Sequence, residues 1–478
     1  MFLYETAAAE KEIVMKKALK VISLITAITM GMTMIGGCAG GKEKTDDGKV
    51  KITIAGWPDP NTDENGYKTQ EEIAKKFMSE NPDIIVEGDT FQFSTDTFYP
   101  RAEGGDLPTL FFLPFTEAEK IIRFGYAADL TEGFKRAGFY DSISSFVLDN
   151  ISRDGKVYLI PRKVYSLGLA MNMEHMEAAG LVEEDGTPMA PKTFDELTQV
   201  AVKLKEATGK AGFIFPTTTN GGGWFFTALA WNFGGSFMTN DNGKWTATMD
   251  SPEVVSALQW LKDLKWKYDV LPETTLISNN EMNQSFGSGN VGMSFSTESF
   301  ANTYSAYGFD INNIGFSYLP AGDKRHVTLM GGSYAAVNKN ATQEQIDAAI
   351  KWIEFNGITM NLTDSIKDNI KKTYEDLAEH NNIVGIKDIS IWGDDTEFVL
   401  YRNSVIDELK NVNPNHVRLY NECKDIEYQA EEPMCAQDLY AALDACIQEV
   451  LTNKEADCAE VLKKANSDFQ QNYLSYEN

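Results

Sequence analysis

The chain of 478 residues is acidic, with 70 aspartates and glutamates against 43 lysines and arginines and a formal net charge of −27 at pH 7. This charge argues against binding to nucleic acid or lying flat on an anionic membrane, because like charges repel. Hydrophobic residues make up 43% and aromatic residues 11% of the chain, which is typical of a folded protein with room for two or three domains.

The N-terminal segment has the order of features of a secretory signal. A basic stretch at 16–20 precedes an uncharged apolar run at 21–35, which is shorter than the roughly 20 residues of a spanning helix. Gly36 and Gly37 then lead to Cys38, and this ending resembles a bacterial lipobox. The resemblance implies cleavage before Cys38, acylation of that cysteine with palmitate as an expected lipid, and anchoring on the extracellular face of the cell membrane. A signal-anchor with an incidental cysteine is the alternative.

Residues 1–14 contain three glutamates where a signal is normally basic, so Met15 is the expected true start and 1–37 the expected signal. Residues 38–49 are the expected lipid anchor and tether. The residues after Cys38 are small, polar and charged, which predicts a flexible segment. No later run of about 18 apolar residues occurs, so the sequence predicts no other segment that spans a membrane.

The region after the tether alternates between strand and helix patterns. This alternation predicts crossover units and a mainly parallel sheet. The expected strands lie at 50–57, 84–87, 110–113, 157–160 and 167–171, with helices at about 70–79 and 117–124 and a loop at 161–166.

The middle of the chain carries helix-capping signals. Thr193 and Glu196 have the spacing of a capping box, and an apolar helix face follows through 197–204. The other expected elements are a buried helix at 224–231, a hairpin between Phe237 and Trp245, a helix from Ser251-Pro252, strands at 291–295 and 334–337, a helix from the capping box of Thr342 and Gln345 to about Phe355, and a mostly helical tail.

Motifs of known enzymes are missing from the sequence. The four histidines lie far apart, at 175, 326, 380 and 416, and none has the spacing of a metal site. Neither a GxSxG elbow nor a GxxxxGK[ST] loop occurs. The glycines of 287–292 match GxGxxG but run into a strand pattern, whereas a dinucleotide loop must enter a helix. These motifs therefore give no support for an enzyme, and no cofactor is predicted, but a pair of carboxylates for glycoside cleavage stays open because such pairs meet in space and not in sequence.

One segment has the ligand spacing of a calcium loop. Oxygen-bearing side chains stand at positions one, three, five, nine and twelve, with glycine at position six. The first ligand is Asn rather than Asp, and a strand pattern rather than a helix precedes it. A loop that caps the following helix is the alternative. The candidate ligands are Asn61, Asp63, Asn65, Thr69 and Glu72.

Four cysteines follow Cys38, at positions 423, 435, 446 and 458. An even number in an extracellular protein favours two disulfides, and three pairings are possible. None of the four stands in a CxxC pair, so a zinc site is not indicated. Four free thiols are the alternative.

Aromatic residues mark the ends of several expected strands and the adjoining loops. Ligands of open parallel sheets bind at the carboxyl ends of strands. Flat aromatic faces stack on sugar rings, while carboxylate and amide oxygens bind hydroxyl groups. Core packing explains each residue alone, but the set together favours a carbohydrate site. The residues are Trp57, Phe115, Tyr165, Trp224 and Tyr334.

A series of short motifs, in this order, resembles one protein family. The resemblance covers about residues 50–360 and points to the extracellular solute-binding proteins of ABC importers, the sugar-binding family that includes maltose-binding protein. Phe194 stands where that family commonly has Trp, and the tail to residue 478 is longer than usual. The motifs are Gly105–Pro108, Gly125–Leu130, Gly155–Tyr158, Ile160-Pro161, Leu167–Asn172, Ala179–Leu181, Pro191–Leu197, Phe286–Met293 and Met330–Ser333.

The resemblance implies an α/β fold of the periplasmic-binding-protein type (type II-like), with two lobes, crossing hinge strands and extra C-terminal helices. The implied first lobe is 50–162 plus 330–385, and the implied second lobe is 163–329 plus 386–478. A hinge is implied near 161–165 and 331–333. The implied ligand contacts between the lobes are Trp57, Asp59, Phe115, Tyr165, Trp224, Glu298, Gly332 and Tyr334.

The function that the resemblance implies is capture of a carbohydrate, expected to be an oligosaccharide, and its delivery to the permease subunits of an ABC importer without catalysis. Two other classes stay open at this point: a secreted polysaccharide-active enzyme, and a sensor subunit for a membrane kinase. Turnover of glycans would indicate the enzyme, whereas binding without turnover would indicate a receptor.

Overall fold

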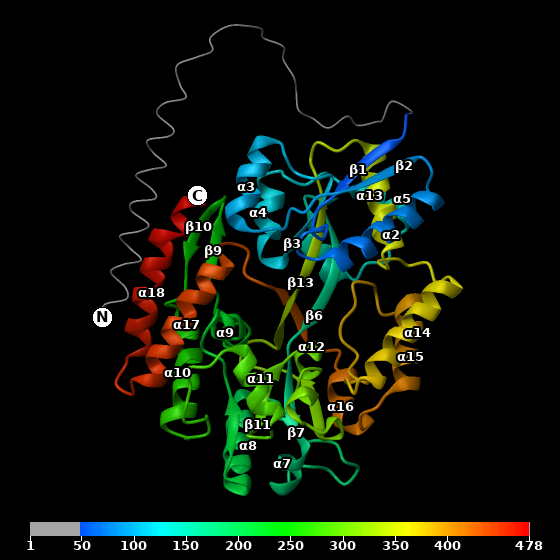
Figure 1. Cartoon of the computed structure of the whole chain (residues 1–478). Helices are drawn as coiled ribbons and strands as arrows, with labels where there is room; N and C mark the ends of the chain where they lie inside the picture. The colour runs from blue at the N-terminus through cyan, green and yellow to red at the C-terminus, as the bar shows by residue number, and fades with distance from the viewer. Residues whose placement is uncertain (1–47, 478) are drawn as a thin grey trace, which may run out of the picture. The chain divides into compact units, whose positions relative to one another are not determined.

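A computed structural model describes residues 48–477 (Figure 1). The expected signal, the start at Met15 and the lipid anchor Cys38 lie outside the described residues, so these predictions stay untested. Within 48–477, none of the helices combines the length and the apolar character that crossing a membrane requires.

The first sheet, within the described residues, is a mixed sheet of six strands in the order β14-β13-β3-β1-β2, with β6 paired to β13. β1 runs parallel to β2 and β3, whereas β13 is antiparallel to β3 and β6. Its apolar side chains pack with Phe77, Leu130 and Trp352 into a cluster that we call the first core. The bounds are β1 Val50–Ile54, β2 Ile84–Gly88, β3 Leu110–Pro114, β6 Leu159–Ser166, β13 Val327–Val337 and β14 Glu427–Ala430.

The helices around the first sheet follow the predicted alternation, with two differences in their starts. α2 begins at Glu64, earlier than expected, because Asp63 Oδ1 accepts a hydrogen bond from Gly66 N at 2.9 Å and caps it. The helix expected at 117–124 is a 3₁₀ turn followed by a short α-helix. The elements are α2 Glu64–Glu80, α3 Thr95–Gly104, η1 Phe115–Glu117, α4 Ala118–Arg123, α5 Thr131–Ala137, α6 Ser145–Ile151, the short pair β4 Ser152–Arg153 and β5 Lys156–Val157, and α13 Gln343–Phe355.

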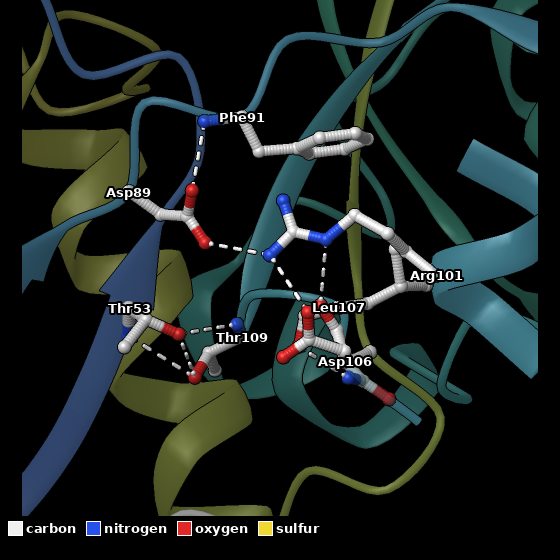
Figure 2. A network of polar contacts seen from close by, with 8 residues as sticks. Thr53, Asp89, Phe91, Arg101, Asp106, Leu107 and Thr109 are labelled. Carbon is white, nitrogen blue, oxygen red and sulfur yellow. Dashed lines mark hydrogen bonds and ion pairs between the residues drawn. The ribbon is translucent and has the colours of Figure 1, made fainter. Parts of the chain in front are cut away.

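A polar network strengthens the first sheet where β1 and β3 share a single register pair, Ile54 with Leu110. Thr109 N donates to Thr53 Oγ1 at 2.8 Å, and Thr53 N donates to Thr109 Oγ1 at 3.1 Å, as Figure 2 shows. The two threonines therefore continue the pairing of β1 with β3 through side chains.

The second sheet contains four strands in the order β12-β7-β11-β8. β11 is parallel to β8, and β7 is antiparallel to both β11 and β12. Its inner side chains form a second core with the flanking helices. The elements are β7 Gly168–Asn172, α7 Met173–Ala178, α8 Phe194–Thr208, β8 Ala211–Ile214, α9 Gly221–Asn232, the hairpin β9 Met238–Asp241 and β10 Lys244–Ala247, α10 Pro252–Trp266, α11 Asn279–Gly287, β11 Val291–Ser296, α12 Glu298–Ala301, η2 Tyr304–Tyr307, η3 Ile311–Asn313 and β12 Ile314–Tyr318.

The two predicted capping boxes differ in the structure. Thr342 and Gln345 form a complete box at the start of α13. Thr193 Oγ1 accepts from Glu196 N at 3.1 Å, but the Glu196 carboxylate accepts from Lys192 N at 2.7 Å rather than from the cap residue. The second box is therefore only half formed, although the helix begins where the sequence predicts.

The segment 161–166, expected as a loop, is a strand, and that prediction is wrong. β6 continues through it and pairs with β13 from Met330 to Ala336. β13 supplies the backbone hydrogen bonds that hold this segment extended. The segment therefore forms a strand without the regular alternation of apolar and polar residues by which a strand is predicted from sequence. β6 and β13 run alongside each other in Figure 1 and pass from one core to the other: Val164 belongs to the first core and Leu167 to the second.

The tail adds a strand as well as helices. β14 lies parallel to β13 at the edge of the first sheet, and α17 packs against α9 and α10 in the second core. The end of the chain contacts α4, since Lys120 Nζ lies 2.6 Å from Glu477 Oε1. The tail elements are α14 Asp364–Glu379, α15 Glu397–Leu409, α16 Pro414–Asn421, β14, α17 Ala436–Thr452, α18 Cys458–Asn472 and η4 Leu474–Tyr476.

All four tail cysteines are free thiols, so the prediction of two disulfides is wrong and the alternative holds. Cys446 and Cys458 are buried and behave as small apolar side chains of the second core. Cys435 instead donates a weak hydrogen bond to Glu477 Oε1, with the sulfur 3.6 Å from the oxygen.

Candidate functional site

Phe115 and Tyr334 form an aromatic wall beside the crossing strands. Phe115 follows β3 and Tyr334 lies on β13, which pairs with β3. Their rings stack with centroids 4.0 Å apart and planes 8° apart, and both are buried. A Cβ on Gly332 would lie 2.0 Å from the carbonyl oxygen of Lys163, so only glycine fits where β13 passes β6 beside this stack.

Tyr165 and Trp224 form a second aromatic pair with a different geometry. Tyr165 lies on β6 and Trp224 in the first turn of α9, and their centroids are 6.2 Å apart at 64°. Both side chains are half-buried. A Cβ on Gly331 would lie 2.6 Å from the Tyr165 ring, so the glycine of β13 makes room for that ring. This pair keeps surface that a ligand can contact.

A carboxylate that sequence reasoning missed completes this group. Glu431 follows β14, and its Oε1 accepts a hydrogen bond of 2.6 Å from Trp224 Nε1. Burial raises the pKa of the Glu431 carboxyl to about 7, and the bond from Trp224 opposes that rise. Burial raises the pKa of Tyr165 and of Tyr334, and the negative charge of Glu431 contributes to both rises because both phenols lie within its field.

The start of α9 is fixed by the tail helix α17. Asp444 accepts from Gly223 N and from Asn220 N, each at 2.7 Å, and so caps the free amides of α9. A Cβ on Gly223 would lie 2.2 Å from the carbonyl oxygen of Tyr440. The glycine run therefore permits close packing of α17, which holds Trp224 in place beside Glu431.

Glu298 forms a second acidic position near β6. It opens α12, and its Oε1 accepts from Asn302 Nδ2 at 2.5 Å. Burial raises the pKa of the Glu298 carboxyl, while the Lys163 and Arg402 cations act in the opposite direction. Lys163 Nζ also donates to Ser299 Oγ at 3.2 Å, so α12 is joined directly to the crossing strand.

The family model for bacterial extracellular solute-binding proteins matches residues 59–355, which is more than half of the chain. The chain belongs to this family. It is therefore an extracellular solute-binding receptor of an ABC importer, and the predicted lack of catalysis is confirmed, because the family binds solutes without converting them.

Solved structures confirm the predicted two-lobed, periplasmic-binding-protein-like fold. A maltose-bound MalE3 of T. maritima is 19% identical, with 88% of this chain and 99% of that chain covered and a TM-score of 0.59. The cyclic alpha-maltosyl-1,6-maltose binding protein of Arthrobacter globiformis is 20% identical, with 88% and 98% covered and a TM-score of 0.62. UgpB of Mycobacterium tuberculosis, in complex with glycerophosphocholine, is 16% identical, with 89% and 98% covered and a TM-score of 0.63.

Two of the expected ligand contacts of this solute-binding protein lie away from the group around Tyr165. Trp57 is only 4% exposed and packs against Trp352, with centroids 6.2 Å apart and planes 22° apart. Asp59 Oδ1 accepts from Asn61 N at 2.8 Å and from Asn61 Nδ2 at 2.9 Å, which closes a local turn. No contact among the described residues joins either side chain to Tyr165 or to Trp224.

Asp89, at the carboxyl end of β2, also has its carboxylate oxygens bonded to neighbouring residues of the first sheet region. Its Oδ1 accepts from Phe91 N at 2.7 Å, and its Oδ2 lies 3.2 Å from Arg101 Nη2. Arg101 also pairs with Asp106 at 3.2 Å and lies over the Phe91 ring (Figure 2). Both oxygens of Asp89 therefore bind the protein itself.

The segment proposed as a calcium loop is mostly helix, so the loop geometry is wrong. Asn65, Thr69 and Glu72 lie inside α2, and Asp63 is its N-cap. The capping alternative is the one that the structure shows. Among residues 48–477, no group of three or more histidine, cysteine, aspartate or glutamate side chains is arranged to hold a metal ion.

A polar group lies at the end of β6. Asp388 Oδ1 accepts from Tyr420 OH at 3.0 Å and from Ser166 N at 3.3 Å, and Ser166 Oγ lies 2.9 Å from Tyr420 OH. These residues line a cavity of about 240 Å³. The pKa of the Asp388 carboxyl is raised to about 7, mainly by burial and also by the nearby Glu298.

Proposed function

We propose that this solute-binding protein captures a carbohydrate, an oligosaccharide by preference, between two lobes and delivers it to the permease subunits of its importer. The observation that carries the proposal is the joint placement of Tyr165, Trp224 and Glu431. Aromatic surface stacks on the C–H faces of sugar rings, and a carboxylate accepts hydrogen bonds from their hydroxyl groups.

The proposed ligand contacts combine expected residues with the one that the structure adds. Tyr165 and Trp224 supply half-buried aromatic surface. Glu431, which bonds to Trp224, and Glu298, in the helix α12 that Lys163 of β6 contacts, supply acceptors. The stack of Phe115 on Tyr334 lies beside Gly332, next in the chain to the Gly331 that makes room for the Tyr165 ring.

The solutes named for proteins of the same fold support a sugar more than any other class. The T. maritima structure contains maltose, and the Arthrobacter protein binds cyclic alpha-maltosyl-1,6-maltose. The Mycobacterium tuberculosis protein holds glycerophosphocholine, so the fold also carries solutes that are not sugars. The sugars named for the first two proteins decide our choice, because an aromatic pair with an acidic partner suits the apolar face and the hydroxyl groups of a sugar ring.

The proposed lobes are 50–162 with 330–385 and 163–329 with 386–478, joined at 161–165 and 331–333. Both joints lie on strands that pair with each other, β6 and β13. The pairing shifts register between Ser333 and Tyr334, and such an irregularity lets a strand bend locally. Rotation about this place would bring solute contacts of the two lobes together.

The lipid anchor is part of the same proposal. Acylation of Cys38 would keep the receptor beside its permease on the extracellular face of the membrane. Labelling of cells with radioactive palmitate is expected to mark the wild-type protein and not the Cys38→Ala variant. Equal labelling of both proteins would overturn the proposed lipid anchor and would leave the proposed solute class unaffected.

A thermal-shift screen tests the solute class. A sugar that binds the folded state raises the melting temperature by mass action, and the shift grows with its concentration. We expect shifts from maltose, maltotriose or related oligosaccharides, with no product formed on prolonged incubation. Shifts produced only by peptides, polyamines or glycerophosphodiesters would contradict the proposal.

A further inference from the structure

Glu431 lies in the tail, outside the residues 59–355 that match the family model. β14 runs parallel to β13 with Ala430 opposite Met330, so the chain leaves the sheet at Glu431 beside Gly331. Gly331 is in turn the register partner of Tyr165 on β6. The tail therefore delivers a carboxylate to the place where the crossing strand presents Tyr165.

The next residue provides an internal comparison. Glu432 accepts from Trp231 Nε1 at 2.8 Å, as Glu431 accepts from Trp224 Nε1 at 2.6 Å. Trp231 and Glu432 are buried, with 1% and 6% of their surface exposed, whereas Trp224 and Glu431 are half-buried. One pair thus belongs to the second core, and the other reaches a surface.

The Glu431 carboxylate has a single hydrogen bond, and no lysine or arginine forms an ion pair with it among residues 48–477. Its surroundings are phenolic: Tyr165, Tyr334 and Tyr440 all lie within its field. Tyr440 is 1% exposed, and its hydroxyl is buried with no hydrogen-bond partner among the described residues. A half-buried carboxylate without a cation has lost part of its hydration, so a donor that reaches its second oxygen stabilises the complex.

We infer that Glu431 is a specificity-determining residue that accepts hydrogen bonds from solute hydroxyl groups and selects uncharged polyhydroxylated solutes over their anionic counterparts. This inference rests on the proposed function and narrows it. An anionic solute would place a second negative charge beside Glu431, where no cation offsets it. A hydroxyl donor would satisfy the free oxygen, and the rings of Tyr165 and Trp224 would cover the apolar face of the same sugar.

The test compares binding of matched neutral and anionic probes by titration calorimetry: maltose against maltobionate, and cellobiose against cellobionate. The wild-type chain is expected to bind the neutral member of at least one pair more than tenfold tighter than its acid. Glu431→Gln keeps the shape and removes the charge. This variant is expected to bind the neutral sugar at least tenfold more weakly than the wild-type chain does. The ratio of its affinities for the neutral sugar and for the corresponding acid is expected to fall.

Glu432→Gln is the matched control, since it changes a neighbouring glutamate that bonds a tryptophan in the same way. It is expected to lower the melting temperature and to leave affinity and discrimination unchanged in the folded protein. Should it fail to fold, Glu427→Gln on β14 takes its place, because Glu427 is exposed and pairs with Arg325 instead.

The pH dependence gives a second measurement. With the pKa of Glu431 at about 7, the ionised fraction rises roughly tenfold between pH 6 and pH 8, and affinity is expected to rise with it. The pKa values of Tyr165, Tyr334 and Tyr440 lie above their ordinary value, so these phenols stay uncharged. Glu432 titrates in the same range, so Glu432→Gln must keep the dependence that Glu431→Gln removes.

The outcomes separate the two proposals. Wild-type binding of a neutral sugar with unchanged affinity and discrimination in Glu431→Gln overturns the inference and leaves the proposed function intact. Failure of the wild-type chain to bind any neutral saccharide overturns the proposed function and the inference with it. Equal binding of a neutral sugar and its acid by the wild-type chain also overturns the inference.

Discussion

Trp57 and Trp224 stand in comparable places, one just after β1 of the first sheet and the other in the first turn of α9 beside the second sheet. Their environments are opposite. Trp57 is 4% exposed, and its indole N–H is buried without a hydrogen-bond partner among the described residues. Trp224 is half-buried, and its N–H donates to Glu431. The comparison shows that a tryptophan near a sheet edge serves packing or binding according to what lies behind it.

The glycines around Trp57 and around the pair of Tyr165 with Trp224 explain the difference. A Cβ on Gly88 would lie 2.2 Å from the Trp57 ring, so β2 opens a space that the ring fills, and Trp352 of α13 closes it. Around Trp224, Gly331 makes room for Tyr165 instead, and the neighbouring strand contributes a carboxylate. The first arrangement removes an aromatic ring from solvent, whereas the second places a ring and an acceptor together.

The largest expected effect is on stability, from Trp57→Ala. Removal of a fully packed indole leaves a cavity and should lower the free energy of unfolding by about 3–5 kcal/mol, measured by urea denaturation. Sugar affinity of the folded protein should stay within a factor of two or so, because the substitution only removes packing. A tenfold loss of affinity with stability retained would place Trp57 in the site after all.

Trp224→Phe should act in the opposite way. The ring volume is largely kept, but Glu431 loses its single donor, and an unpaired buried acceptor costs about 1–3 kcal/mol. We expect the loss mainly in the free energy of sugar binding, measured by calorimetry, together with a further rise in the pKa of Glu431. Trp231→Phe is the control, because it removes the corresponding donor to Glu432 inside the core. Equal loss of binding in both variants would contradict the comparison.

The pH dependence of stability gives a smaller effect, at Asp388, which bonds to Ser166 at the end of β6. The pKa of Asp388 is raised to about 7, mainly by burial and also by Glu298, although Tyr420, Ser166 and the Ile389 amide bond to it. Because the folded-state pKa exceeds the unfolded value, this group's contribution is fully present below about pH 4 and is lost as pH rises through 7.

Between pH 5 and pH 8, Asp388 should therefore lower the unfolding free energy by on the order of 1–2 kcal/mol, after allowance for its partial exposure. The Asp388→Asn variant, followed by urea denaturation at both pH values, should show a shallower decline than the wild-type chain. Glu431 and Glu432 have pKa values raised in the same direction, so part of the decline should persist. A decline of the same size in both proteins would exclude Asp388 as its source.

The helices and most strands of this fold are predictable from the sequence, because the residues that indicate them lie within the same segment. Thr342 and Gln345 predict the start of α13, and the apolar residues of 224–231 predict the buried α9. The strand at 161–166 is missed because β13, more than 160 residues later, supplies its pairing. Glu431 is missed for the same reason: nothing near it in sequence indicates Trp224, and the parallel register of β14 with β13 brings the two together.

The smallest expected effect tests how far spacing alone can mislead. Asn61, Asp63, Asn65, Thr69 and Glu72 match the positions of a calcium loop, yet α2 begins at Glu64 and takes three of them into a helix. Calcium needs six to eight oxygens around one point, and a helix spreads these side chains along its length instead. Titration of chelator-treated protein with calcium should therefore give no heat beyond dilution, and Glu72→Gln should match the wild-type chain. Saturable heat that disappears in Glu72→Gln would show that this segment leaves the helix to bind the ion.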